Sequence, residues 1–159
     1  SLIRQESSFG LKALSTSQAA GLMQMIRPTA LEVADRLKIK IEFPEDLYRP
    51  EVNIPMGVFY IHQVIKEMNF NIPLGLAGYN AGPHKVKQFI NQRDITKKVL
   101  DGGFDTERPG LEELWIDELP WAETTGYVKS ILRNILIYEL IAKSDYQYRP
   151  DFWRDFILK

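Results

Sequence analysis

The sequence has no cysteine, two histidines and no excess of charge of either sign, and each shortage excludes a class of function. Without cysteine the chain forms no disulfide and carries out no thiolate chemistry. His62 and His84 lie far apart and in no recognisable ligand spacing, so we predict neither a metal site nor a cofactor. Twenty Lys and Arg nearly balance 21 Asp and Glu, which argues against nucleic acid or an anionic membrane as a partner.

Long apolar runs are also missing, and signals for β-strands are poor. No run is long enough to cross a bilayer, so we predict no transmembrane segment. Hydrophobic residues make up 45% of the chain and charged residues 26%, which is ordinary for a soluble globular protein. A chain of 159 residues is long enough for one domain with a proper core.

Helical periodicity dominates the chain, and it predicts an all-α fold in one domain at 1–142. An aromatic tail at 143–159 is expected to pack on the same domain, with a missing domain or a partner as its alternative contact. After a first helix that Gly10 stops, we predict helices at 28–38, 51–68, 73–81, 83–90 and 123–142. Residues 18–25 are a candidate for one or two helical turns, and 38–43 for a short strand.

The predicted helix at 51–68 has an apolar face and one small residue. We expect its inner face to be formed by Ile54, Val58, Ile61, Ile65 and Met68. Asn53, Ile54 and Gly57 are expected to serve in packing, with Gly57 letting another helix approach closely. The chain starts with Ser inside the first predicted helix and shows no signal peptide, so we expect a trimmed domain or a processed fragment.

The first helix carries a carboxylate on its apolar side. Leu2, Ile3, Glu6 and Phe9 recur at helical spacing, and with Gly10 as the stop Glu6 falls in or near the last turn. The helix dipole and apolar neighbours there both disfavour negative charge, so we expect a raised pKa for the Glu6 carboxyl. A carboxylic acid that stays protonated near neutral pH can protonate a leaving glycosidic oxygen. On position alone, a solvated surface glutamate is the plainer interpretation.

Four motifs follow one another along the chain. They are Glu6-Ser7-Ser8-Phe9 with Ser15 nine residues after the glutamate, Gly21-Leu22-Met23-Gln24, Ala77-Gly78-Tyr79-Asn80-Ala81-Gly82, and Glu123-Thr124-Thr125-Gly126-Tyr127-Val128. Each alone is weak, but the ordered series resembles the catalytic domain of the soluble lytic transglycosylases, the goose-type-lysozyme-like enzymes of bacterial cell walls. The resemblance covers about residues 2–138 and implies a lysozyme-like helical fold.

The resemblance implies a peptidoglycan lytic transglycosylase with one catalytic glutamate, at the position of Glu6. Glu6 would first act as acid on the bridging oxygen of the β-1,4 bond between N-acetylmuramic acid and N-acetylglucosamine. It would then act as base on the sugar's own 6-hydroxyl, which closes onto C1, while the N-acetyl group helps to hold the positive charge in between. The expected product is a 1,6-anhydro-muramyl end, and no water is consumed. One group can take both roles because the first step leaves it deprotonated.

The resemblance also implies a set of substrate-binding residues: Ser15, Gln24, Tyr79, Asn80, Glu123 and Tyr127. The Gln24 amide can both donate to and accept from a sugar, and Tyr79 offers a ring face and a hydroxyl. Tyr127 matches the tyrosine that lies near the catalytic carboxyl in this family. Plain structural roles stay open: a loop serine at Ser15, a core aromatic at Tyr79, and a first-turn acid at Glu123. A second catalytic carboxylate at Glu123 ranks below a binding or bracing role.

Two other functions remain as alternatives to the transglycosylase. One is a hydrolytic muramidase on the same scaffold, and the other is an inactive glycan-binding module. Ile26 and Arg27 depart from the commonest form of the family's second motif, which affects the lining of the sugar groove and not the chemistry. The implied partner is the peptidoglycan glycan strand, which implies a periplasmic or envelope location. Members of this family often carry more chain before the catalytic helix, including a large helical domain in some, and the sequence leaves an additional upstream domain open.

Overall fold

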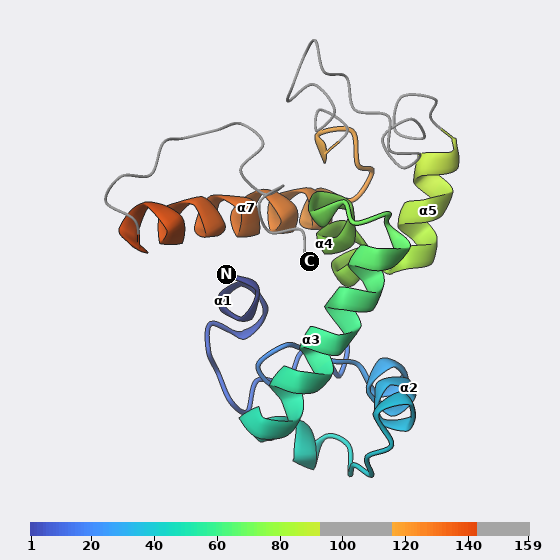
Figure 1. Cartoon of the computed structure of the whole chain (residues 1–159), viewed down its shortest axis with the longest axis vertical. Coiled ribbons are helices and arrows are strands. Elements are labelled where there is room, and N and C mark those ends of the chain that lie inside the picture. The colour runs from blue at the N-terminus through green and yellow to red at the C-terminus, as the bar shows by residue number, and fades with distance from the viewer. Residues whose placement is uncertain (93–115, 143–159) are drawn as a thin grey trace. The chain divides into compact units, whose positions relative to one another are not determined.

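The computed structural model describes residues 1–92 and 116–142, and in these ranges the chain is all-α, as predicted (Figure 1). Extended backbone pairs there in two isolated bridges, Leu14 with Ala20 and Ala20 with Met25. The chain divides into two compact units, Ser1–His62 and Gln63–Lys159, and one helix contributes residues to both. The predicted tail at 143–159 lies outside the described residues.

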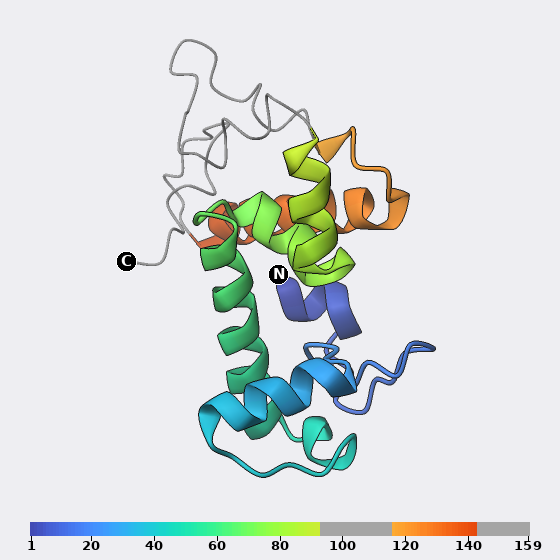
Figure 2. The ribbon, with the colours of Figure 1, turned by 90° about the vertical axis from the view of Figure 1, so that its right-hand side faces the viewer.

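The first unit is built from three helices and a short 3-10 helix. They are α1 (Leu2–Ser7), α2 (Arg27–Leu37), η1 (Glu45–Tyr48) and the larger part of α3 (Pro50–Glu67). Its core cluster joins α2 and α3 to the loop that precedes α2, and it consists of Ala20, Met25, Ala30, Val33, Ala34, Leu47 and Met56. Figure 2 shows α2 crossing beside the first half of α3. Each large apolar side chain buried here contributes roughly 1.5–3 kcal/mol.

Helix α2 confirms the prediction at 28–38 almost to the residue. It has Pro28 in its first turn, where the missing N–H costs nothing, and it ends at Leu37 before Lys38, which adopts a left-handed conformation with φ 56°. Its buried residues are Ala30, Val33 and Ala34, whose helical spacing places them on one face.

The predicted end of the first helix is wrong by about a turn. Helix α1 ends at Ser7, and Ser8 and Phe9 both have left-handed backbones, with φ of 49° and 66°. The Ser8 N–H donates to the Arg4 carbonyl at 3.0 Å and closes the helix. Phe9 therefore does not continue the apolar stripe, and its side chain is 60% exposed.

The segments 18–25 and 38–43 contain neither the helical turns nor the strand that we predicted. Positive φ occurs at every third residue of the first segment, at Gln18, Gly21 and Gln24. Because a right-handed helix needs negative φ throughout, this segment forms a series of tight turns instead. Residues 38–43 form an irregular connection that leads into η1. Partly buried Ile41 and Phe43 in this connection pack against the core cluster of the first unit.

Helix α3 matches the predicted helix at 51–68, and Met68, directly after its end, is buried as predicted. In the first half of the helix, however, the inner face is rotated from the predicted one. Val58 is 51% exposed, whereas Asn53, Met56 and Gly57 are buried. The apolar pattern missed this face because two of its members are an amide and a glycine. The residue that Gly57 admits is also different from the prediction. It is Met23, in the loop before α2, and its Cβ lies 2.7 Å from where a Gly57 Cβ would stand.

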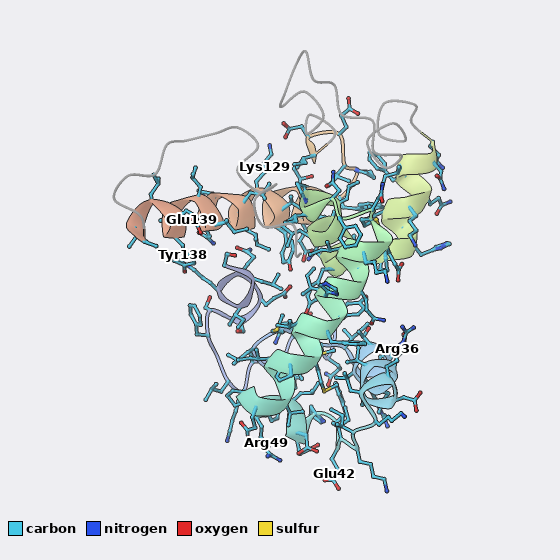
Figure 3. All side chains as sticks on the ribbon, in the orientation of Figure 1. Arg36, Glu42, Arg49, Lys129, Tyr138 and Glu139 are labelled. Carbon is cyan, nitrogen blue, oxygen red and sulfur yellow. The ribbon has the colours of Figure 1, made fainter. Side chains whose placement is uncertain are left out.

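An ion-pair cluster stands at the start of α3. Arg49, labelled in Figure 3, donates from Nε to Glu51 at 2.9 Å and lies within 3.5 Å of Asp46. The pKa of the Glu51 carboxyl is lowered by its own backbone N–H and then by Arg49, and the pKa of Arg49 is raised by Glu51. Because these groups are exposed, the cluster adds little to stability.

The second unit packs its helices around α4 (Ile72–Ala81). Helices α5 (Pro83–Asn91) and α7 (Ala122–Ala142) both contact α4, and both views show α7 running past it (Figures 1 and 2). These three helices confirm the predictions at 73–81, 83–90 and 123–142. Asn71 caps α4 by accepting from the Leu74 N–H at 2.9 Å.

Close approach onto α4 depends on two glycines. Gly75 faces Ile65 and Gly78 faces Val64, so the last turns of α3 can lie against α4. None of the helices in the described ranges is both long enough and apolar enough to cross a bilayer.

Candidate active site

Glu6 lies in the last turn of α1, as predicted, and its side chain is partly buried. The next residue fixes the end of this helix to the rest of the first unit. The Ser7 hydroxyl donates to the Leu22 carbonyl at 2.9 Å and also lies 3.2 Å from the Ile3 carbonyl of its own helix. The catalytic candidate is therefore joined, one residue away, to the Gly21-Leu22-Met23-Gln24 motif. Sequence reasoning quoted Ser7 as part of a motif but assigned it no role.

Ser15 closes a short loop between α1 and that motif. Its hydroxyl oxygen accepts from the Ala19 N–H at 2.9 Å, and its own N–H donates to the Ala19 carbonyl at 2.9 Å. The plain loop role considered for Ser15 is thus present. An accepting hydroxyl still has its own hydrogen to donate, so the loop role leaves Ser15 with a hydrogen-bond donor.

Gln24 has a left-handed backbone, with φ 47°, at the end of the motif. Its side-chain Nε2 donates to two carbonyls of its own loop, Gly21 at 2.8 Å and Ala13 at 3.2 Å. The Gly21 N–H donates to the same Ala13 carbonyl at 2.8 Å. Both hydrogens of the Gln24 amide are therefore directed at backbone, and the carbonyl oxygen is the part of the side chain left to meet a ligand.

Asn53, on α3, is completely buried and makes three hydrogen bonds, two of them to the loop that carries Gln24. Its Oδ1 accepts from the Met23 N–H at 2.8 Å, and its Nδ2 donates to the carbonyls of Ala20 at 3.0 Å and Leu47 at 2.9 Å. Sequence reasoning gave Asn53 only a packing role. The signal available in the sequence was a polar residue one turn before Gly57 on the same helix face. A search for apolar periodicity does not detect a polar residue.

Four predicted site residues lie in the second unit, at the end of α4 and the start of α7. Tyr79 and Asn80 are partly buried in the last turn of α4. The Thr124 hydroxyl, on α7, donates to Asn80 Oδ1 at 2.7 Å, and Thr124 is 3% exposed. Sequence reasoning assigned no role to Thr124. Since the Asn80 oxygen accepts from Thr124, the Asn80 NH₂ group is the one left to donate.

Glu123 and Tyr127 flank Thr124 on α7 in different environments. Glu123 is exposed in the first turn, where the helix dipole favours an acid, so the plain alternative for this residue is satisfied. Tyr127 is buried one turn later. The candidate residues are thus divided between the units: Glu6, Ser15 and Gln24 in the first, and Tyr79, Asn80, Glu123 and Tyr127 in the second. Among residues 1–92 and 116–142, no three His, Asp or Glu side chains gather as metal ligands would.

Comparison with known proteins gives one consistent result. The family model of the transglycosylase SLT domain matches residues 1–100, more than half of the chain. The soluble lytic murein transglycosylase of Escherichia coli K12 is 31% identical over 132 residues, which cover 82% of this chain and 18% of that protein.

Two solved structures share the fold. An inactive glutamate-to-glutamine mutant of the lytic transglycosylase Slt from Pseudomonas aeruginosa matches with a TM-score of 0.71 and 32% identity, over 89% of this chain and 21% of that one. The 70 kDa soluble lytic transglycosylase of Escherichia coli matches with a TM-score of 0.70 and 29% identity, over 89% and 21%. The fold is therefore the all-α, lysozyme-like one that the sequence predicted. The chain spans about a fifth of the length of these relatives.

Proposed function

The chain belongs to the transglycosylase SLT domain family, and from that premise we propose that it cleaves peptidoglycan glycan strands as a lytic transglycosylase. The match over residues 1–100 carries the proposal, because it includes Glu6, the Gly21-Leu22-Met23-Gln24 motif and the motif at residues 77–82. The bond cleaved is the β-1,4 bond between N-acetylmuramic acid and N-acetylglucosamine. The relative from Escherichia coli K12 is named a soluble lytic murein transglycosylase, which supports the same substrate here.

Glu6 is the proposed general acid and base. Protonated, it gives its proton to the bridging oxygen as the glycosidic bond breaks; deprotonated by that step, it takes the proton of the 6-hydroxyl that closes onto C1. The atoms balance without water, and the muramyl end becomes a 1,6-anhydro sugar. A single glutamate-to-glutamine change in the Pseudomonas aeruginosa relative goes with an inactive enzyme, which supports a mechanism that depends on one glutamate.

For three other candidates, the hydrogen bonds within the protein indicate whether the side chain would donate to the sugar or accept from it. The Ser15 hydroxyl donates, since its oxygen already accepts from Ala19. The Gln24 carbonyl accepts, since its NH₂ group is directed at Gly21 and Ala13. The Asn80 NH₂ group donates, since its oxygen accepts from Thr124. We propose binding or bracing roles for Tyr79, Tyr127 and Glu123.

A hydrolytic muramidase is the second candidate, because water in place of the 6-hydroxyl needs the same acid. An inactive glycan-binding module is the third. The peptidoglycan substrate places the chain, on this proposal, in the periplasm or cell envelope.

Replacing Glu6 with glutamine tests the proposed acid. The amide keeps the shape of the side chain but has no proton to transfer, so release of soluble fragments from peptidoglycan sacculi is expected to fall at least about a hundredfold. Circular dichroism is expected to show an unchanged helical fold. Glu45→Gln, at an exposed carboxylate in η1, is the matched control and retains full activity. Turnover by the Glu6 variant at the wild-type rate would remove Glu6 from the mechanism.

The pH dependence of cleavage gives a second test of Glu6. The acid works only when protonated, so activity is expected to be present below its pKa and lost as the pH rises through it. A carboxyl near an ordinary value of about 4.3 would lose activity well below neutral pH, whereas the raised pKa expected from the position of Glu6 retains it toward neutrality. The measurement is kcat/KM against pH on soluble glycan fragments. A profile that stays flat well above neutral pH contradicts the assignment.

A further inference from the structure

We infer that Asn53 is a positioning residue for glycan binding: it holds the Gly21–Gln24 turn so that Gln24 presents its carbonyl oxygen, and not its NH₂ group, to the sugar. The part that concerns the sugar rests on the proposed function, whereas the clamp on the turn does not. Asn53 itself is completely buried and does not need to touch the substrate.

The first support is the complete use of the Asn53 amide. Its oxygen and both of its N–H groups are engaged, with Met23, Ala20 and Leu47, at 2.8 to 3.0 Å. A buried amide with every bond made is strongly oriented, because any rotation leaves a polar group unpaired. Two of the three partners, Ala20 and Met23, are on either side of Gly21 and Leu22, so the amide spans the base of the turn.

The second support is the close fit at Gly21. A Cβ atom there would collide with the Leu47 carbonyl oxygen and the Asn53 Nδ2, and Gly21 also needs its positive φ of 75°. The backbone of the turn therefore lies directly on the Asn53 amide. A shift of the Asn53 amide would therefore displace the Gly21 backbone directly.

The third support is the route from this turn to the Gln24 side chain. Gln24 Nε2 donates to the Gly21 carbonyl at 2.8 Å, and the Gln24 N–H donates to the same oxygen at 3.1 Å. One carbonyl, set by the clamp, thus orients both the backbone and the side chain of Gln24. The Gln24 oxygen then selects a donor on the ligand, such as the N–H of an N-acetyl group or a sugar hydroxyl.

The experiment compares Asn53→Ala, Gln24→Met and the double variant in the same chain, with two readouts. Amide hydrogen exchange reports the clamp without any substrate: Met23 N–H is expected to exchange at least about tenfold faster in Asn53→Ala, because its acceptor is gone. Steady-state cleavage of soluble glycan reports whether the Gln24 carbonyl oxygen is held toward the sugar. KM is expected to rise about tenfold in each single variant, with kcat changed much less, as for the loss of one good hydrogen bond.

The double variant separates positioning from general destabilisation. If Asn53 acts through Gln24, the double variant has the KM of Gln24→Met alone, because the acceptor that Asn53 positions is already absent. Val33→Ala is the control, because Val33 belongs to the core cluster that contains the Asn53 partners Ala20 and Leu47. It is expected to lower stability while leaving KM at the wild-type value. Should Asn53→Ala fail to fold, Asn53→Ser repeats the test with a smaller loss of polar contacts.

Two results overturn the inference. One is a KM in the double variant that rises by the product of the two single-variant increases. The other is an Asn53→Ala variant in which the Met23 N–H exchanges faster but KM is unchanged. If wild-type protein cleaves no glycan, the proposed function fails and the sugar-presenting role fails with it. Faster Met23 exchange in Asn53→Ala then still establishes the clamp as a separate result. Unchanged Met23 exchange refutes the clamp whatever the activity.

Discussion

At the scale of single residues, Gly21 has the closest contacts at its missing Cβ among the glycines that the structure describes. Any side chain there meets the Leu47 carbonyl oxygen and the Asn53 amide, and φ is 75°. We expect Gly21→Ala to lower the free energy of unfolding by about 2–4 kcal/mol, since left-handed strain and overpacking add. Urea denaturation followed by circular dichroism measures it.

Gly126→Ala is the matched control for that substitution. Gly126 lies exposed on α7 with no heavy atom near its missing Cβ, so alanine there is expected to raise the free energy of unfolding by about 0.5–1 kcal/mol. Equal stabilities for the Gly21 variant and the wild type would refute the close fit described at the turn.

The candidate residues could be predicted from the sequence, but the polar atoms they offer could not. Helical spacing placed Glu6 in the last turn of its helix, which is confirmed. The direction of the Gln24 amide and the burial of Asn53 depend on contacts with residues as many as 33 positions away along the chain, and local patterns do not contain them. The polarity of Asn80 likewise depends on Thr124, 44 residues later.

At the scale of elements, the hydroxyl of Thr124 links α7 to α4. Thr124→Val keeps the shape of the side chain and removes the 2.7 Å bond to Asn80, leaving a partly buried oxygen unpaired. We expect a loss of about 1–2 kcal/mol in the free energy of unfolding, together with a higher KM for glycan. Chemical denaturation and steady-state kinetics measure the two effects.

Thr125→Val controls for the loss of a helical hydroxyl. The Thr125 hydroxyl donates to the Trp121 carbonyl, within the same turn of chain, and such local bonds contribute little to helix stability. We expect a change below about 0.5 kcal/mol and an unchanged KM. Equal losses in the two valine variants would mean that the α4–α7 link has no special role.

Long helices followed from the sequence, and the loop before α2 did not. Periodicity found α2, α3, α4, α5 and α7 with ends within one or two residues, because each buries an apolar face over several turns. The same pattern failed at 18–25, where positive φ at Gln18 and Gln24 replaces helix by tight turns. That failure falls on the loop that carries Gln24, where hydrogen bonds to buried backbone outweigh propensity.

At the scale of the whole molecule, family membership and fold are established for a chain that spans about a fifth of its relatives. The central claim is the non-hydrolytic reaction, and mass spectrometry of the fragments released from peptidoglycan sacculi tests it most directly. A transglycosylase releases muropeptides lighter by one water and without a reducing muramyl end, and Glu6→Gln releases none. Ordinary reducing muramyl ends from the wild-type chain would show that water is the acceptor, and would contradict the account in favour of a muramidase.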